Sequence, residues 1–362
     1  MTNSVYIHIP FCQSICSYCA FTKFFYNEMQ VNLYLDSLKK EIQEKYKGEL
    51  IKTIYIGGGT PSSLTIKELE NLFEIIKIFK LSNDLEFTIE VNPESIDEEK
   101  LKLFKTNKVN RISMGVESTL AKNLKYLKRN HDFNLVLEKI NLIKKYISNI
   151  NVDLIYGFKN QTLKDLAYDI DNILSLDITH ISTYSLMIED NTYLKIMKEK
   201  NIPEDLDCEM YELIINKLKK IGFNHYEISN FSKPGYESKH NLVYWNNLPY
   251  YGFGVSASGY LGNIRYTNTS SLKKYFDGNY LNNEEILSDK DIISYALILG
   301  FRKISGINKD EFLKRYKVDI LDLYNIRDLI KSGLIVDNGS NLLISYDKIY
   351  VENSILINFV GE

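Results

Sequence analysis

Short apolar runs alternate with segments of helical periodicity through the first half of the chain. Six of these runs have the length and the residue types of buried β-strands. Most of them are followed by a stretch with apolar residues at helical spacing. This alternation predicts an α/β protein built from βα units around a parallel sheet. The predicted strands are residues 5–9, 53–56, 86–91, 111–116, 151–156 and 180–186.

Two of the predicted helices begin with a capping box, in which a hydroxyl and a carboxylate each bond a free backbone amide. These are Thr65 to Glu68 and Ser95 to Glu98. Six βα units fit either an open doubly wound sheet or a partial barrel. We favour a partial (β/α)6 barrel, similar to a TIM barrel, because polar and glycine residues recur where the strands end. Parallel barrels keep their chemistry at that face.

The second half of the chain predicts a different organisation. A helix over 201–221 and a strand over 225–231 come first. Residues 235–268 are rich in Tyr, Asn and Gly with weak periodicity, so we expect loops that cover the open side of the barrel. The predicted domains are therefore the barrel at 1–200, an extension with covering loops at 201–287, and a C-terminal domain at 288–362.

The C-terminal domain reads as a small α+β, winged-helix-like unit. Helices are predicted over 289–303, over 308–315 with Asn308 as its cap, and over 321–332. A β-hairpin follows, with Asn338-Gly339 at its turn. Because this region has no basic stripe, we interpret it as a structural or partner-binding unit.

Composition and charge exclude several classes of protein. The chain of 362 residues has a net charge of −3 with both signs mixed throughout, so no nucleic-acid partner is expected. An apolar strand begins within four residues, without a basic region before it, and no apolar run approaches the length of a membrane span. Three of the four cysteines lie in one cluster, which fits a reducing compartment. We therefore expect a cytoplasmic protein.

The three clustered cysteines are Cys12, Cys16 and Cys19. They are too close together for mutual disulfides, and a closed structural zinc site needs four ligands. Three thiolates at this spacing suit a 4Fe-4S cluster with one iron left open for another ligand. A zinc site completed by His8 or a distant His is the competing interpretation. Cys208 lies in a helical stretch and is expected to be a bystander.

These motifs carry a family resemblance. The pattern Cys-x3-Cys-x2-Cys with Tyr18 inside it, followed by Gly57-Gly-Gly-Thr-Pro61, resembles the radical S-adenosylmethionine superfamily. The run from Tyr6 to Cys12 resembles the branch that contains oxygen-independent coproporphyrinogen III oxidase and its heme chaperone relatives. The resemblance covers nearly the whole chain. It implies a 4Fe-4S cluster on the three cysteines and S-adenosylmethionine at the open iron.

The resemblance also implies which residues contact S-adenosylmethionine. Arg129 matches the partner of the methionine carboxylate, and Asp153 matches that of the ribose hydroxyls. Glu117 stands where the family more often has Gln, so two hydrogen-bond donors are lost there. The full set implied for this ligand is Tyr6, Tyr18, Gly58, Gly59, Thr60, Glu90, Glu117, Arg129 and Asp153.

Taken alone, two of these features allow other interpretations. A glycine turn after a strand can be a tight connection or a phosphate-binding nest. Beside a three-cysteine motif, Gly58, Gly59 and Thr60 resemble the site for the methionine amine. Glu90 can be a strand-end carboxylate in solvent.

A second motif lies further along the chain, at His240-Asn-Leu-Val-Tyr-Trp245. A lone His is more often structural, and an aromatic pair more often packs in a core. The string His-Asn-x-x-Tyr-Trp nevertheless resembles one associated with heme binding in the heme chaperone branch. Imidazole is a common axial ligand of heme iron. The candidate heme contacts are therefore His240, Asn241, Tyr244 and Trp245.

Two sequence features separate the functions that the resemblance allows. The oxidase pattern has a further Cys two residues after the third, and here that position is Phe21. The oxidase branch also has a longer segment before the cluster, whereas eleven residues precede Cys12 here. We therefore expect a heme chaperone rather than an enzyme of porphyrin biosynthesis.

The implied cargo is heme, and the implied recipients are apo-hemoproteins such as respiratory enzymes. A homodimer and a transient membrane contact are compatible with the sequence. The oxidase, and a radical enzyme with another substrate, remain the alternatives.

Overall fold

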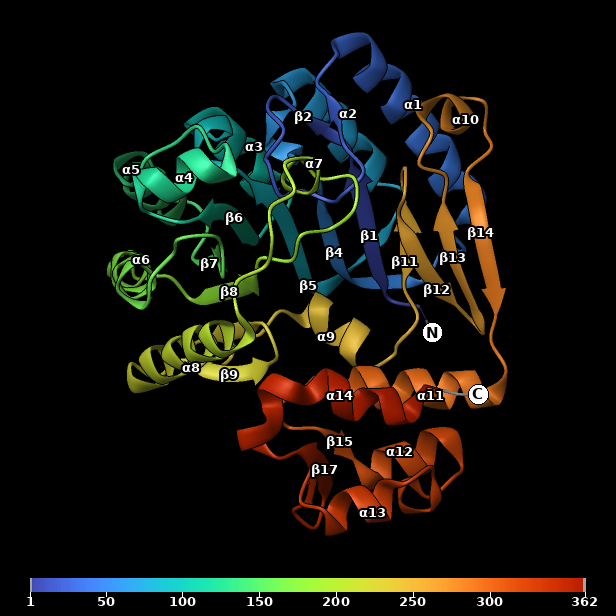
Figure 1. Cartoon of the computed structure of the whole chain (residues 1–362). Helices are drawn as coiled ribbons and strands as arrows, with labels where there is room; N and C mark the ends of the chain where they lie inside the picture. Colours follow the sequence, from blue (N-terminus) through green and yellow to red (C-terminus); the bar gives the residue numbers. More distant parts are fainter. Residues whose placement is uncertain (1, 361–362) are drawn as a thin grey trace.

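The computed structural model describes residues 2–360 and is built around one nine-stranded sheet (Figure 1). The strand order is β11-β1-β4-β5-β6-β7-β8-β10-β9, and the strands from β11 to β8 are parallel. The edges β11 and β9 do not pair, so the sheet is an open, partial barrel, as predicted. The six predicted parallel strands are β1 (Ser4–Ile9), β4 (Leu50–Gly58), β5 (Lys80–Val91), β6 (Arg111–Glu117), β7 (Asn149–Tyr156) and β8 (His180–Ser185).

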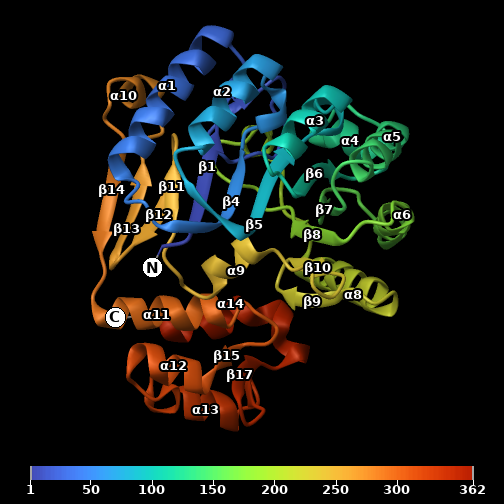
Figure 2. The same ribbon diagram turned by 180° about the vertical axis from the view of Figure 1, so that it is seen from behind.

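Helices cover the convex face of this sheet (Figure 2). They lie in the connections between successive parallel strands and return the chain to the start of the next one, with α4 and α5 both between β6 and β7. Their apolar faces meet the outward side chains of the strands in one large core. The helices are α1 (Glu28–Lys45), α2 (Ile66–Ile76), α3 (Glu98–Thr106), α4 (Ala121–Leu127), α5 (Phe133–Lys144) and α6 (Leu163–Ser175).

One of the two predicted capping boxes is confirmed. Thr65 accepts from the backbone of Glu68, whose carboxylate bonds back to the Thr65 amide. The box at Ser95 is wrong, because α3 begins two residues later. Asp97 is its cap and accepts from the amide of Lys100, while Ser95 ends a short 3-10 turn. Asp97, rather than Ser95, is therefore the N-cap of this helix.

The region after β8 is more regular than its sequence suggests. The expected loops at 235–268 contain α9 (Lys239–Trp245), β11 (Tyr251–Phe253), β12 (Ser258–Leu261) and β13 (Ile264–Asn268), so that prediction is wrong. These strands are short and lined with Tyr and Gly, which hid their alternation. β12 and β13 form a separate antiparallel sheet with β14 (Leu281–Ile286), and α10 (Leu272–Phe276) lies between β13 and β14.

The predicted strand at 225–231 is two strands. The chain turns back after β9 (Asn224–Glu227), and β10 (Asn230–Ser232) pairs with both β9 and β8. The helix predicted over 201–221 is α8 (Glu204–Lys220), and the short α7 (Tyr193–Ile196) precedes it.

The C-terminal residues pack in a hydrophobic cluster of their own, between positions 296 and 359. The predicted hairpin is present, with β16 (Ile335–Asp337) antiparallel to β17 (Asn341–Ile344) and β15 (Ile307–Asn308) on the other side. The separate cluster supports a division of the chain near residue 288. The other elements are α11 (Asp289–Gly300), α12 (Lys309–Tyr316), α13 (Ile326–Lys331) and α14 (Glu352–Leu356), with 3-10 turns at Ile320–Asp322, Tyr346–Val351 and Ile357–Phe359.

Two helix predictions in this region meet the structure differently. Asn308 caps α12 and accepts from the amide of Glu311, as expected. The helix predicted over 321–332 begins only at Ile326, because Asp319 caps a 3-10 turn and Tyr324 has a φ of +44°. A left-handed residue ends any continuous helix.

None of the helices within residues 2–360 combines the length and the apolar composition that a membrane span requires.

Candidate cofactor site

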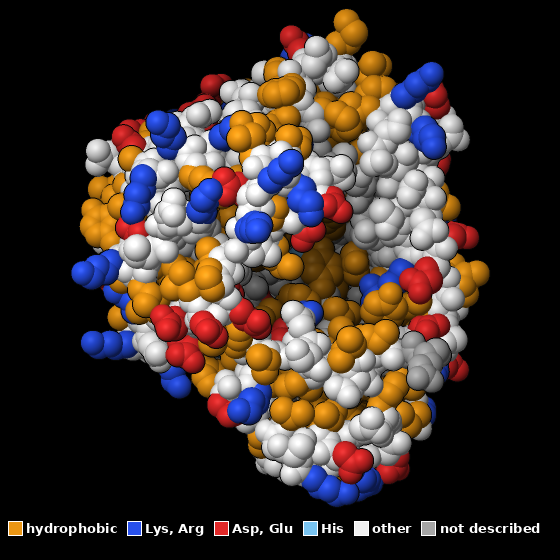
Figure 3. All heavy atoms as spheres, in the orientation of Figure 1, with side chains coloured by type: hydrophobic (Ala, Val, Ile, Leu, Met, Phe, Trp, Pro, Cys, Tyr) orange, Lys and Arg blue, Asp and Glu red, His pale blue; other side chains and the backbone are white. Residues whose placement is uncertain are grey.

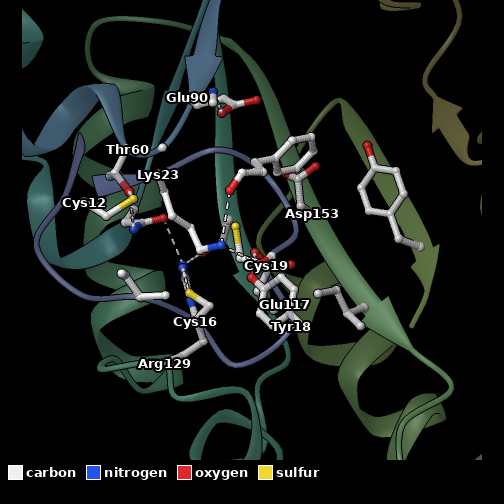
Figure 4. A pocket seen from close by; sticks show the side chains of 18 of the residues that line it. Cys12, Cys16, Tyr18, Cys19, Lys23, Thr60, Glu90, Glu117, Arg129 and Asp153 are labelled. Atoms are coloured by element: carbon white, nitrogen blue, oxygen red, sulfur yellow. Dashed lines mark hydrogen bonds between the residues drawn. The ribbon is translucent and has the colours of Figure 1, made fainter. Parts of the chain in front are cut away.

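The three clustered cysteines lie at the C-terminal end of the barrel strands. Cys12 ends the short strand β2 (Phe11–Cys12), which pairs with β3 (Phe24–Phe25), and the loop between them carries Cys16 and Cys19. Ser17 fixes this loop, since its amide and its hydroxyl both donate to carbonyls at the end of α4. The thiols are free and lie on one side of a pocket (Figure 4).

The pocket has a volume of about 370 Å³, within the range typical of small-molecule sites. The cysteine loop forms one wall, and the ends of β4 to β8 form the other. Of the residues that we predicted for the two cofactors, eleven line it together. These are Cys12, Cys16, Tyr18, Cys19, Gly58, Gly59, Thr60, Glu90, Glu117, Arg129 and Asp153.

A chain of hydrogen bonds connects Cys12 with Cys16 through side chains of the wall formed by the strand ends. The hydroxyl of Thr60 donates to Cys12 Sγ at 3.6 Å, and Asn92 donates to that hydroxyl at 3.3 Å. Asn92 accepts in turn from Arg129 Nη2 at 3.0 Å, and Arg129 Nη1 lies 3.5 Å from Cys16 Sγ. The chain therefore directs hydrogen-bond donors at two of the three sulfurs, and such bonds stabilise thiolates.

The glycine turn after β4 is shaped by its surroundings rather than by a phosphate. Gly58 has a φ of +112°, and a Cβ on Gly59 would lie 2.8 Å from the Ile9 carbonyl oxygen. The amides of Gly58, Gly59 and Thr60 donate to Glu90, Ile9 and Phe11 respectively. Because these donors are all engaged, the phosphate-nest interpretation is wrong.

Glu117 stands at an irregular point of β6. The register with β7 shifts between Gly115 and Glu117, and Glu117 has a φ of +65°. This bulge turns the carboxylate into the pocket, where it accepts from the Tyr18 hydroxyl at 2.9 Å. This hydrogen bond holds Tyr18, which lies between Cys16 and Cys19 in the sequence, against the wall formed by the strand ends.

Two half-buried carboxylates, Glu90 and Asp153, give the wall formed by the strand ends its acidic character. Burial raises the pKa of Glu90 to about 7, although Tyr55 and the Gly58 amide both donate to it. Burial also raises the pKa of Asp153, against hydrogen bonds from Ser113 and Asn151. The solvent-exposed interpretation of Glu90 is therefore wrong. These groups can accept hydrogen bonds from the hydroxyls and amine of a polar ligand.

The Glu117 carboxyl makes stability depend on pH. Burial raises its pKa from 4.5 to about 7, so the folded chain holds a proton that the unfolded chain releases. The contribution of this carboxyl to the free energy of unfolding is complete below about pH 4.5, and it is lost as the pH rises through about 7. Glu117→Gln removes this dependence and keeps an oxygen for Tyr18.

We therefore expect Glu117→Gln to gain up to about 3 kcal/mol on the wild type between pH values of about 5 and about 8. Urea denaturation of both proteins at the two pH values measures this gain. A stability difference that does not change with pH would contradict the assignment.

The geometry argues against a zinc site at the cysteines. Within residues 2–360, no three side chains of His, Cys, Asp or Glu come close enough to share one metal ion. Both ring nitrogens of His8 are also engaged, with the Tyr6 hydroxyl and the Thr22 carbonyl. Three separated thiols fit a larger cluster, which distributes its thiolate ligands over several irons. Burial raises the pKa of the Cys12 thiol to about 11, so occupation of the site must displace protons.

Tyr6 is the predicted ligand contact that does not line the pocket. Its hydroxyl bonds His8 Nδ1 at 2.8 Å, and its ring lies 6.2 Å from that of Tyr55, in the barrel interior below the cysteines. Its hydroxyl is connected to the cysteine loop through His8, whose other nitrogen bonds the Thr22 carbonyl.

The heme-type motif lies at the opposite end of the barrel. Helix α9 packs against β4, and Glu86 in the middle of β5 accepts from the amides of Lys239 and His240 (Figure 1). His240 is buried, and its nitrogens bond Thr53 at 2.8 Å and Tyr244 at 2.7 Å. Burial lowers the pKa of His240 to about 3. Asn241, Tyr244 and Trp245 are half-buried around it. In this arrangement His240 fastens the helix and has no nitrogen free for iron.

His240→Ala is accordingly expected to destabilise the protein. The change removes two buried hydrogen bonds and leaves a cavity, at a cost of about 2–4 kcal/mol. Urea denaturation measures the loss, and Asn241→Ala on the same helix is the matched control. Equal stability of the two variants would contradict the structural role that we assign to His240.

The structure adds pocket residues that the sequence did not single out. Asn92, Ser113 and Gly115 line the pocket beside the predicted contacts, and Lys23 donates to the carbonyls of Cys19 and Phe21. Ser113 and Gly115 alternate with the outward residues of β6, so two-residue periodicity from Glu117 would have found them. Asn92 follows Val91 outside the strand, where sequence gives no such signal.

Fold and site together define the class. The model of the radical SAM superfamily matches residues 6–173 of the chain. The solved structure of the radical SAM enzyme coproporphyrinogen III oxidase (HemN) from Escherichia coli superposes with a TM-score of 0.86, over 99% of this chain and 90% of that one. At 22% identity this match concerns the fold alone.

Sequence comparison identifies the family. The chain is 37% identical to the heme chaperone HemW of Bacillus subtilis, over 99% of this chain and 100% of the relative. It is 38% identical to the heme chaperone HemW of Lactococcus lactis, over 99% and 97% respectively. The chain belongs to the HemW family of the radical SAM superfamily. Membership of that superfamily implies a 4Fe-4S cluster and S-adenosylmethionine.

Proposed function

We propose that this protein is a cytoplasmic heme chaperone, which binds heme and delivers it to apo-hemoproteins such as respiratory enzymes. The observation that carries the proposal is the end-to-end similarity to two proteins named heme chaperone HemW. The side chain at position 21 adds to it. Phe21 lines the pocket beside Cys19 and is 67% exposed, where the oxidase pattern has a further cysteine.

In this proposal Cys12, Cys16 and Cys19 hold the 4Fe-4S cluster. The donor set fits the group, because three free thiols share one pocket and two of them receive hydrogen bonds. When bound, the cluster supplies one electron to a sulfonium ligand at its open iron. Lys23 fixes the turn after Cys19 through two backbone carbonyls, and so keeps the third thiol in place.

The rest of the pocket would hold S-adenosylmethionine. Arg129 is a fork of donors suited to the methionine carboxylate, and its neighbours Asn92 and Gly115 orient it. The amine would be received by the Gly58-Gly59 turn, which lines the pocket, and by the Thr60 hydroxyl, which lies 3.6 Å from Cys12 Sγ. Asp153 lies on the far wall, where a carboxylate can accept from two ribose hydroxyls. Tyr18, Glu90 and Glu117 complete the wall.

An anaerobic titration with heme tests the proposal. The cluster-reconstituted protein should bind heme with saturation, measured by the porphyrin absorbance band. In parallel, coproporphyrinogen III is incubated with the protein, S-adenosylmethionine and a reductant, and no decarboxylated product should form. Product formation with weak or undetectable heme binding would assign the protein to the oxidase branch instead.

A further inference from the structure

A continuous row of side chains crosses the barrel interior one step below the cofactor pocket. Tyr6, Tyr55, Thr88 and Arg111 are direct neighbours across β1, β4, β5 and β6. Side chains two residues apart on a strand share a face, so the row lies beneath Glu90 and Ser113, which line the pocket. Tyr55 is the member of the row that lines the pocket, and the other three side chains lie below it in the barrel interior.

Arg111 is the unusual member of this row. It is 2% exposed and is the largest fully buried side chain among residues 2–360. Its guanidinium has no hydrogen bond or ion pair with any residue of that range, and its Nε is buried without a partner. Against the rise that burial causes, its charge lowers the pKa of the carboxylates Glu90 and Asp153, but both lie beyond ion-pair distance. A buried charge without a partner is strongly destabilising.

A second unpartnered group lies beside it. The hydroxyl of Thr88, the cross-strand neighbour of Arg111, is also buried without a hydrogen-bond partner. A guanidinium and a hydroxyl side by side present several donors to the same space. A carboxylate is the common group that accepts from such donors, and it also compensates the charge.

The opposite end of the row is aromatic. The rings of Tyr6 and Tyr55 lie 6.2 Å apart, and Tyr55 continues to His240 at 5.3 Å. The ring centroids of His240 and Tyr244 lie 5.0 Å apart, and those of Tyr244 and Tyr250 lie 4.6 Å apart. The molecule is hollowed below the α7 segment, with hydrophobic side chains along the floor of the hollow (Figure 3). A wall of rings suits the face of a flat, conjugated molecule.

We propose that Arg111 anchors a carboxylate of a flat aromatic ligand that lies in the barrel interior, along the tyrosines and beneath the cofactor pocket. On the proposed function, on which this inference rests, the ligand is heme and the carboxylate is a propionate. The heme-type motif then forms the end wall of the interior through His240 and Tyr244. The anchor itself comes from the start of β6.

The test compares heme with heme dimethyl ester, in which both propionates are blocked. The wild type should bind the diester about 10- to 100-fold more weakly than heme, as expected for a lost charge-assisted hydrogen bond. Arg111→Met should bind both ligands with similar, weak affinity, and Arg111→Lys should keep part of the preference. The matched control is Arg327→Met, which removes an exposed arginine paired with Asp322.

Stability separates an anchor from a structural arginine. Because Arg111 has no partner, Arg111→Met should unfold in urea at the wild-type midpoint or above it. A lowered midpoint, or a wild type that binds the diester as tightly as heme, would overturn the inference while the heme chaperone stands. If neither heme nor the diester binds the wild type, the proposed function fails, and this inference fails with it.

Discussion

Cys16→Ser abolishes the visible absorbance of the iron-sulfur cluster after anaerobic reconstitution. Cys16 is half-exposed on the loop between β2 and β3, so its replacement leaves the core intact. Serine keeps the hydrogen bond from Arg129 but lacks the soft thiolate that iron-sulfur clusters need. The spectrum should therefore disappear while the far-ultraviolet circular dichroism is retained.

The matched control for this change is Cys208→Ser. Cys208 lies on α8, outside the cofactor pocket, and is only partly exposed. Its replacement should leave the cluster spectrum and the iron content at the wild-type level. If Cys16→Ser retained the spectrum, or if Cys208→Ser lost it, the assignment of the three ligands would be wrong.

Arg129→Met lowers the affinity for S-adenosylmethionine by about 100-fold or more. The guanidinium lines the pocket beside Glu117, and it bonds Asn92 Oδ1, the Gly115 carbonyl and Cys16 Sγ. Methionine fills a similar volume and removes every donor, which costs roughly 1.5–3 kcal/mol for each charged hydrogen bond to the ligand. Isothermal titration of the cluster-reconstituted protein with S-adenosylmethionine measures the loss.

Arg129→Lys distinguishes charge from shape. Lysine keeps the positive charge but lacks the planar fork that binds a carboxylate through two donors, so its affinity should fall between those of the wild type and of Arg129→Met. Wild-type affinity in Arg129→Met, with the cluster spectrum intact, would remove Arg129 from the ligand site.

The parallel sheet was predictable because its signal is local. The six predicted strands each contain a short apolar run, and most are followed by a helix that repeats apolar residues at helical spacing. The position of the cysteines after β1 and of the glycine turn after β4 then placed both motifs at one end of the barrel. The meeting of these two motifs at one end follows from the topology of a parallel barrel.

The region from residue 235 to 268 was not predictable in the same way. β11, β12 and β13 are three to five residues long, and their Tyr and Gly residues show no clear alternation. Gly252 is needed because a Cβ there would strike the Ser258 carbonyl oxygen, a contact that only the folded sheet reveals. Short strands that depend on distant partners leave a weak trace in sequence.

The residues of the candidate site also differ in how far the sequence could predict them. The cysteines and the glycine turn belong to contiguous motifs, whereas Asn92 and Arg111 matter through their neighbours in space. Arg111 reads as an ordinary charged residue at the start of a strand, and its burial appears only when β5 and β7 pair on either side of β6. His240 shows the converse, because its motif points to iron and its two hydrogen bonds point to structure.

Heme transfer to an apo-protein distinguishes a chaperone from a protein that only binds heme. The cluster-reconstituted protein is loaded with one equivalent of heme, freed of unbound heme, and mixed anaerobically with the apo-form of a b-type cytochrome. We expect the absorbance of the holocytochrome to appear faster than heme dissociates to a scavenging apo-myoglobin variant in a parallel experiment. A transfer rate equal to the dissociation rate would show that heme merely leaks from the protein, and would contradict a chaperone.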